Sequence, residues 1–200
     1  MLTYANQLTI IRMVFAPLVV VLLIYGHPIA ALLIFFLAGV SDCLDGLLAR
    51  ALQQKTELGS FLDPVADKLL LTSAFITLTI PWLSVVLHIP AWLTILAISR
   101  DVTIAASALI IHLQTGHSKF PPSFLGKCTT ATELMTVGDC LLANVWPGPG
   151  TLLFRPLVYV TLLLIVASGL HYFYRSVKII GAYQKAAVGN GERRDQDPRS

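Results

Sequence analysis

Charged residues are scarce in this chain. Asp, Glu, Lys and Arg make up only 12% of its 200 residues, against about a quarter in typical soluble domains. Its three cysteines, Cys43, Cys128 and Cys140, are widely spaced and form no CxxC pair, which excludes a thiol-based metal or redox motif. Hydrophobic residues make up 56% of the chain, which is more apolar surface than one soluble core of this length can bury. The composition predicts a protein of the lipid bilayer, and no nucleic-acid partner is expected.

Long apolar runs predict an all-α fold, a polytopic membrane helix bundle of about six transmembrane helices, because one crossing needs about 20 apolar residues. The expected spans are residues 8–26, 28–48, 66–87, 90–113, 126–146 and 151–177. The first of these is interpreted as a retained span and not as a signal peptide. Residues 1–182 are expected to form the membrane domain, and residues 183–200 a polar, disordered cytoplasmic tail.

Basic residues indicate the orientation of the predicted spans, because cytoplasmic loops carry an excess of Lys and Arg. One set of span ends is rich in them: Arg50, Lys55, Lys119, Lys127, Arg175 and Lys178. The short turns on the other side contain neither, and only Arg155 lies close to that face. We therefore expect an inner or plasma membrane protein with both termini in the cytoplasm. The basic tail fits either a solvated segment that fixes topology or a contact with anionic headgroups.

Four aspartates near the cytoplasmic side carry the chemical information. Asp42 and Asp45 are three residues apart, and Asp63 and Asp67 are four apart, so each pair shares one face of a helix. A single Asp at the centre of a span costs about 2.5–3.5 kcal/mol, and a cluster also repels itself. A hard cation such as Mg²⁺ or Mn²⁺ among the carboxylates would offset both effects. Taken singly, Asp63 before Pro64 also fits a helix N-cap, and Asp42 and Asp45 fit polar residues at the interface.

The aspartates belong to the pattern Asp42-x₂-Asp45-Gly46-x₂-Ala49-Arg50-x₈-Gly59-x₃-Asp63-x₃-Asp67, which resembles the signature of the CDP-alcohol phosphatidyltransferase family. Every fixed position is filled. The resemblance extends to the N-terminal Asn6-x₂-Thr9-x₂-Arg12 and leaves out only the tail. It implies an enzyme that transfers a phosphatidyl group from CDP-diacylglycerol to an alcohol and releases CMP. It also implies a homodimer with its active site on the cytoplasmic side.

The resemblance implies a role for each matching residue. Divalent metal, Mg²⁺ or Mn²⁺ and commonly two ions, would be bound by Asp42, Asp45, Asp63 and Asp67. Asp67 would also be the catalytic general base. The CDP-lipid would be contacted by Asn6, Thr9, Gly46, Ala49, Arg50, Thr56 and Gly59.

Arg100 lies within the fourth predicted span, where an unpaired cation is costly. One hypothesis pairs it with a carboxylate on another helix, such as Glu133. The other, which we favour, places it with Lys127 and Arg175 in a cationic pocket for an acceptor phosphate, because those two residues lie on the same cytoplasmic side. The planar donor fork of Arg suits phosphate. The acceptor is therefore expected to carry a phosphate.

Two phosphate-bearing acceptors compete. Glycerol 3-phosphate, which we take as the lead, would make the protein a phosphatidylglycerophosphate synthase. Phosphatidylglycerol would make it a cardiolipin synthase, a branch that the runs at residues 98–101 and 122–127 resemble. Inositol phosphate is a third possibility. A metabolite or ion transporter is a remote alternative, because transporters place such sites in broken helices near the midplane, whereas Gly and Pro here lie mostly at span ends.

Overall fold

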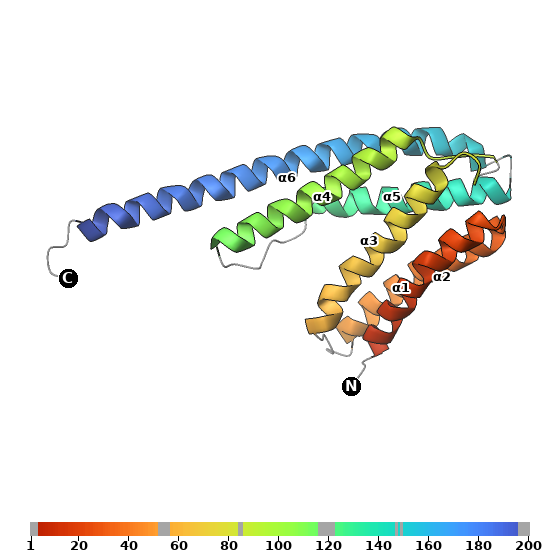
Figure 1. Ribbon diagram of the computed structural model, residues 1–200, viewed down its shortest axis with the longest axis horizontal. Coiled ribbons are helices and arrows are strands. Elements are labelled where there is room, and N and C mark those ends of the chain that lie inside the picture. Colours follow the sequence, from red (N-terminus) through yellow and green to blue (C-terminus); the bar gives the residue numbers. More distant parts are fainter. Residues whose placement is uncertain are drawn as a thin grey trace. The chain divides into compact units, whose positions relative to one another are not determined.

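The computed structural model describes residues 4–51, 57–83, 86–115, 123–146, 148 and 150–195. These residues form six α-helices and no strand (Figure 1). The helices are α1 Tyr4–Ile24, α2 Pro28–Ala51, α3 Glu57–Thr79, α4 Ala91–Thr115, α5 Phe124–Val145 and α6 Gly150–Asp195. The prediction of an all-α fold is confirmed.

Helix α3 differs from its predicted bounds at both ends. It begins at Glu57 and not at residue 66, so Asp63 lies inside the helix and the N-cap interpretation of that residue is wrong. It ends at Thr79 and not at residue 87. The reason for the early end is Pro81, since the residue before a proline is disfavoured in the helical region.

Helix α6 is longer than the sequence predicts. It continues past residue 182 to Asp195, so the backbone stays helical through most of the segment expected to be disordered. Seven of the thirteen residues from 183 to 195 are Ala, Gln, Lys, Glu or Arg, which are good helix formers. Polarity by itself does not oppose helix formation.

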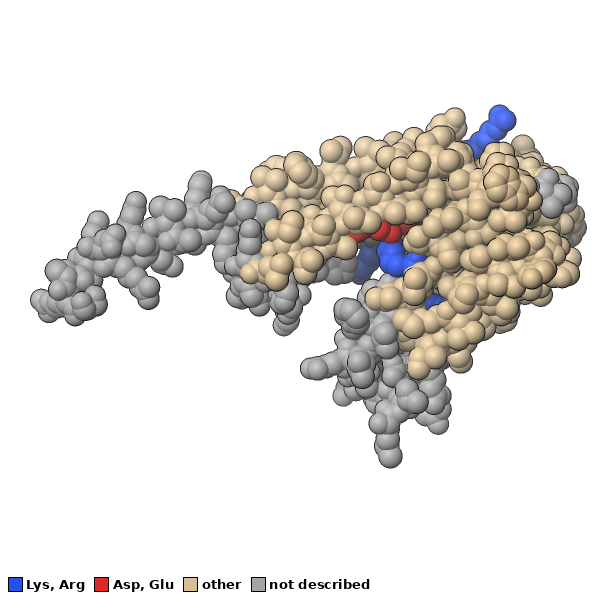
Figure 2. All heavy atoms as spheres, in the orientation of Figure 1, with Lys and Arg blue, Asp and Glu red and all other residues tan. Residues whose placement is uncertain are grey.

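Two helical stretches in the described part of the chain are long and apolar enough to cross a bilayer, Ala91–Ile110 and Thr151–Lys178. Thr9–Ile24 and Pro28–Asp42 are shorter apolar helices. Large apolar side chains are exposed on all six helices, among them Val14, Phe36 and Leu163. On the face shown in Figure 2, uncharged residues cover almost all of the described surface.

The chain divides into two compact units. The first contains Met1–Ile95 and Thr130–Thr161, and the second contains Leu96–Thr129 and Leu162–Ser200. In the first unit, α1 packs against both α2 and α3. Small residues that are fully buried, such as Ala31, Ala66 and Ala74, allow these helices to approach closely.

A buried asparagine stabilises the irregular segment that follows α3 in the first unit. The Oδ1 atom of Asn144 accepts hydrogen bonds from the backbone N–H groups of Val86, at 2.8 Å, and Leu87, at 3.2 Å. Its Nδ2 atom donates to the carbonyl oxygen of Leu87 at 2.9 Å. Backbone N–H and C=O groups that are removed from water require such partners, because an unpaired buried group costs free energy.

Candidate active site

Three helices of the first unit bring two of the aspartates to one arginine. The Nη1 atom of Arg12, on α1, lies 2.9 Å from Oδ1 of Asp42 on α2. The same nitrogen donates a hydrogen bond to Oδ1 of Asp67 on α3 at 2.5 Å. A single cationic group therefore contacts carboxylates from two different helices.

The three side chains differ in exposure. The side chain of Arg12 is 1% exposed, whereas those of Asp42 and Asp67 are 51% and 40% exposed. On α1, Arg12 shares its buried face with Thr9 and Ala16, three and four residues away. A buried arginine is tolerated only if it is paired, and the two carboxylates supply that pairing. The carboxylates themselves remain partly accessible.

The chemistry of this donor set fits a divalent metal ion. Two carboxylate oxygens are directed at one positive charge, and oxygen ligands are those that Mg²⁺ and Mn²⁺ prefer. The backbone is helical at Asp45 and at Asp63, as their predicted spacing requires, but their side chains lie outside the described part of the chain. Among the described side chains, no group of three or more His, Cys, Asp or Glu could hold a metal.

A second ion pair connects α3 to α5. The Nζ atom of Lys68 lies 4.0 Å from Oε2 of Glu133, whose side chain is 1% exposed. Lys68 directly follows Asp67, so a buried acid on α5 holds the basic neighbour of the proposed base.

Sequence reasoning did not identify Lys68 as a site residue, although its position beside Asp67 was a signal. It also gave no role to Arg12, although a lone cation in an apolar span requires a partner.

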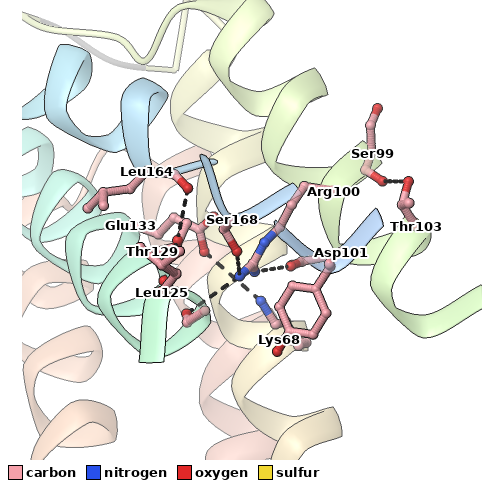
Figure 3. A network of polar contacts seen from close by, with 12 residues as sticks. Lys68, Ser99, Arg100, Asp101, Thr103, Leu125, Thr129, Glu133, Leu164 and Ser168 are labelled. Atoms are coloured by element: carbon pink, nitrogen blue, oxygen red, sulfur yellow. Dashed lines mark hydrogen bonds and ion pairs between the residues drawn. The ribbon is translucent and has the colours of Figure 1, made fainter. Parts of the chain in front are cut away.

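The second unit holds Arg100 in a network of its own. The Nη1 atom donates to Oδ1 of Asp101 at 2.8 Å, and Nη2 donates to Oγ of Ser168 at 2.8 Å and to the carbonyl oxygen of Gly126 at 3.5 Å (Figure 3). The residue is 7% exposed. Within the second unit, the acidic partner of Arg100 is thus its neighbour Asp101.

Gly126 allows the close approach of helices around Arg100. A Cβ atom at this position would lie 3.2 Å from both Ser123 Oγ and Tyr172 Oη, and 3.3 Å from Arg100 Nη2. The Tyr172 hydroxyl accepts a hydrogen bond from the backbone N–H of Ser123 at 2.9 Å, and Ser123 Oγ accepts one from Gly126 N–H at 3.0 Å. These contacts tie the beginning of α5 to α6.

The other predicted site residues are placed as follows. Lys127 is exposed on α5, Arg175 is half-buried on α6, and both belong to the second unit. Thr9 is fully buried on α1. Thr56 lies outside the described residues. For five other predicted site residues the structure describes the helical backbone but not the side chain: Asn6, Gly46, Ala49, Arg50 and Gly59.

Comparison with known proteins identifies the class. The family model described as CDP-alcohol phosphatidyltransferase matches residues 2–173. The chain belongs to this family, as the aspartate pattern predicted.

Three relatives illustrate the range of similarity. A "Probable phosphatidylglycerophosphate synthase" of Mycobacterium tuberculosis (strain ATCC 25618 / H37Rv) is 33% identical over 189 residues, covering 92% of this chain and 86% of the relative. The "CDP-diacylglycerol--glycerol-3-phosphate 3-phosphatidyltransferase" of Haemophilus influenzae is 38% identical over 137 residues, covering 67% and 72%. The "Cardiolipin synthase (CMP-forming)" of Homo sapiens is 31% identical over 194 residues, covering 89% and 63%.

Proposed function

We propose that this protein is a membrane-embedded enzyme that transfers the phosphatidyl group of CDP-diacylglycerol to glycerol 3-phosphate and releases CMP. The observation that carries the proposal is the convergence of Asp42 and Asp67, two aspartates of the family pattern, on Arg12. The relatives from Mycobacterium tuberculosis and Haemophilus influenzae, whose names specify phosphatidylglycerophosphate synthesis, support this choice of acceptor.

Asp67 is the proposed general base. Its carboxylate is partly exposed, so an acceptor hydroxyl can reach it, and the contact with Arg12 fixes its position. A carboxylate is a weak base, so it takes the proton as the new P–O bond forms and the hydroxyl becomes acidic. The hydroxyl oxygen attacks the phosphorus that bears diacylglycerol, and the bond from this phosphorus to the CMP oxygen breaks.

Asp42, Asp45, Asp63 and Asp67 are the proposed ligands of Mg²⁺ or Mn²⁺, with two ions as the family resemblance implies. When bound, the metal neutralises phosphate charge and stabilises the leaving group. Arg12 lies on the buried side of Asp42 and Asp67 and holds both carboxylates in one place. The CDP-lipid contacts proposed from the family pattern surround these aspartates in the sequence.

Arg100, Lys127 and Arg175 are the proposed binding residues for the acceptor phosphate. All three belong to the second unit. The guanidinium of Arg100 is held in one orientation by Asp101 and Ser168. A preoriented cation binds phosphate at a lower entropic cost than a mobile one.

Phosphatidylglycerol as acceptor, which defines a cardiolipin synthase, is the second candidate. It is favoured by the similarity to the human protein of that name and by the Ile-Ser-Arg-Asp run that ends at Asp101. Both candidates share the same donor, the same aspartates and the same product CMP.

In this proposal the protein spans the inner or plasma membrane, and its active site and both termini lie on the cytoplasmic side. The proposed assembly is a homodimer. The apolar stretches Ala91–Ile110 and Thr151–Lys178 and the exposed apolar side chains on all six helices support insertion in a bilayer. The asymmetric distribution of Lys and Arg supports the orientation.

The test measures CMP release by the purified full chain in mixed micelles that contain CDP-diacylglycerol and Mg²⁺. Glycerol 3-phosphate, phosphatidylglycerol and inositol phosphate are supplied in parallel, and glycerol 3-phosphate should give the highest kcat/KM. Asp67→Asn should lower kcat by about 10²–10⁴, the contribution of a positioned general base, whereas the control Asp139→Asn on α5 should keep it. CMP release with phosphatidylglycerol alone would replace the lead by the second candidate, and full activity of Asp67→Asn would refute the assignment of the base.

A further inference from the structure

A cavity of about 800 Å³ lies in the first unit, next to the segment that follows α3 and the first turns of α6. His88 and Trp92 line it from one side, and Arg155 and Tyr159 line it from α6. It lies beyond the C-terminal end of α3, whereas Asp67 lies near the middle of that helix. At 1.5 Å per helical residue, the distance along α3 from Asp67 to Thr79 is about 18 Å. The cavity is therefore separate from the candidate active site.

Arg155 is the charged residue of this cavity. It is exposed and makes no ion pair or hydrogen bond with any other described residue. It shares one face of α6 with Thr151 and Tyr159, each four residues away, and both of these also line the cavity. An exposed guanidinium without a carboxylate partner provides a planar set of donors that suits a phosphate oxygen.

The rest of the lining is apolar and aromatic. Phe154 and Val158 are 7% and 4% exposed and form a buried floor, whereas Trp92 and Tyr159 are exposed. Trp and Tyr are enriched where a protein meets the headgroup region of a bilayer. A ligand that fills this cavity must therefore combine a negative group with an apolar body.

We propose that this cavity binds an anionic phospholipid, with its phosphate against Arg155 and its acyl chains along the apolar lining. The inference goes beyond the proposed function and rests on it only for the placement of the chain in a membrane. By the predicted topology the cavity faces the leaflet opposite to the active site, so its occupant is a bound lipid and not the substrate. This also explains why a single arginine occurs near a membrane face that is otherwise poor in basic residues.

The test is lipid binding by the full chain in detergent, measured by native mass spectrometry as the fraction of protein that carries one lipid. Phosphatidic acid is the anionic probe, phosphatidylcholine the zwitterionic probe, and inorganic phosphate the competitor. Wild type should retain phosphatidic acid at least about tenfold more strongly than phosphatidylcholine. Arg155→Gln should weaken this binding about fivefold, in line with one basic residue near an anionic lipid, and Arg155→Lys should restore part of it. Lys178→Gln removes an exposed cation elsewhere on α6 and should leave binding unchanged.

Equal retention of the two lipids by wild type, or unchanged retention by Arg155→Gln, would overturn the proposal. Displacement of the lipid by millimolar inorganic phosphate would show a free-phosphate site and would overturn it as well. CMP release is measured on the same samples. Arg155→Gln should keep wild-type turnover, so a failure of lipid binding is distinguishable from a failure of the proposed enzymatic function.

Discussion

Arg12 should couple energetically to both Asp42 and Asp67, because one of its nitrogen atoms contacts both carboxylates. The perturbation is Arg12→Gln combined with Asp67→Asn or with Asp42→Asn in double-mutant cycles. Gln keeps most of the side-chain volume of Arg but removes the charge. Each cycle isolates the interaction between the two residues from the effects of the single substitutions.

The expected magnitude follows from distance and exposure. A hydrogen bond to a charged group contributes about 1.5–3 kcal/mol when it is buried, whereas an exposed ion pair contributes about 0.2–1 kcal/mol. Arg12 is buried, but the side chains of Asp67 and Asp42 are 40% and 51% exposed, so solvent screens both pairs. We expect a coupling of about 1–2 kcal/mol for Asp67, whose contact is shorter, and about 0.5–1 kcal/mol for Asp42.

The assay is thermal unfolding of the purified variants in detergent with EDTA present, so that no divalent ion replaces the lost charge. A change of 1 kcal/mol corresponds to about 2–4 °C in Tm for a chain of this size. The Tm of the Arg12/Asp67 double variant should therefore exceed the additive value by about 2–8 °C.

Asp139 supplies the matched control, because it lies on α5 and makes no ion pair within the described residues. Arg12→Gln and Asp139→Asn should be additive within about 0.3–0.5 kcal/mol. If the Arg12/Asp67 cycle is equally additive, the guanidinium does not hold the two carboxylates, and our account of the site is wrong.

Three further predictions follow from the contacts described. Asn144→Ala should lower Tm by about 4–24 °C, because two backbone N–H groups lose their acceptor at about 1–3 kcal/mol each, while turnover per folded enzyme is retained. An unchanged Tm would show that the segment at Leu87 does not depend on this side chain. Arg100→Gln should raise the KM for glycerol 3-phosphate about tenfold or more and leave the KM for CDP-diacylglycerol within about twofold of wild type. Ser168→Ala should have a smaller effect on the KM for glycerol 3-phosphate. Equal increases in both KM values would contradict an acceptor-specific role. Chelation by EDTA should abolish CMP release, and Mg²⁺ or Mn²⁺ but not Na⁺ should restore it; activity that persists in EDTA would exclude the divalent-metal hypothesis.

Helix bounds show where sequence reasoning succeeded and where local chemistry corrected it. The apolar runs predicted the six helices, because the length and hydrophobicity of a run are properties of contiguous residues. The end of α3 at Thr79 was missed although Pro81 signalled it, since the apolar run continues to Leu87 and hydropathy alone does not register a backbone restriction. The helical continuation of α6 to Asp195 was missed because polarity was taken as a sign of disorder.

The sequence by itself determined the family, the helical class and the aspartates of the candidate site, since each of these depends on residue types at fixed spacing along the chain. Only the tertiary structure decided their partners. Arg12 and Asp67 are 55 residues apart, and Asn144 is 57 residues from Leu87, so no local spacing connects them. Which cation meets which carboxylate depends on how the helices pack, because a buried charge is stable only where the fold brings an opposite charge to it.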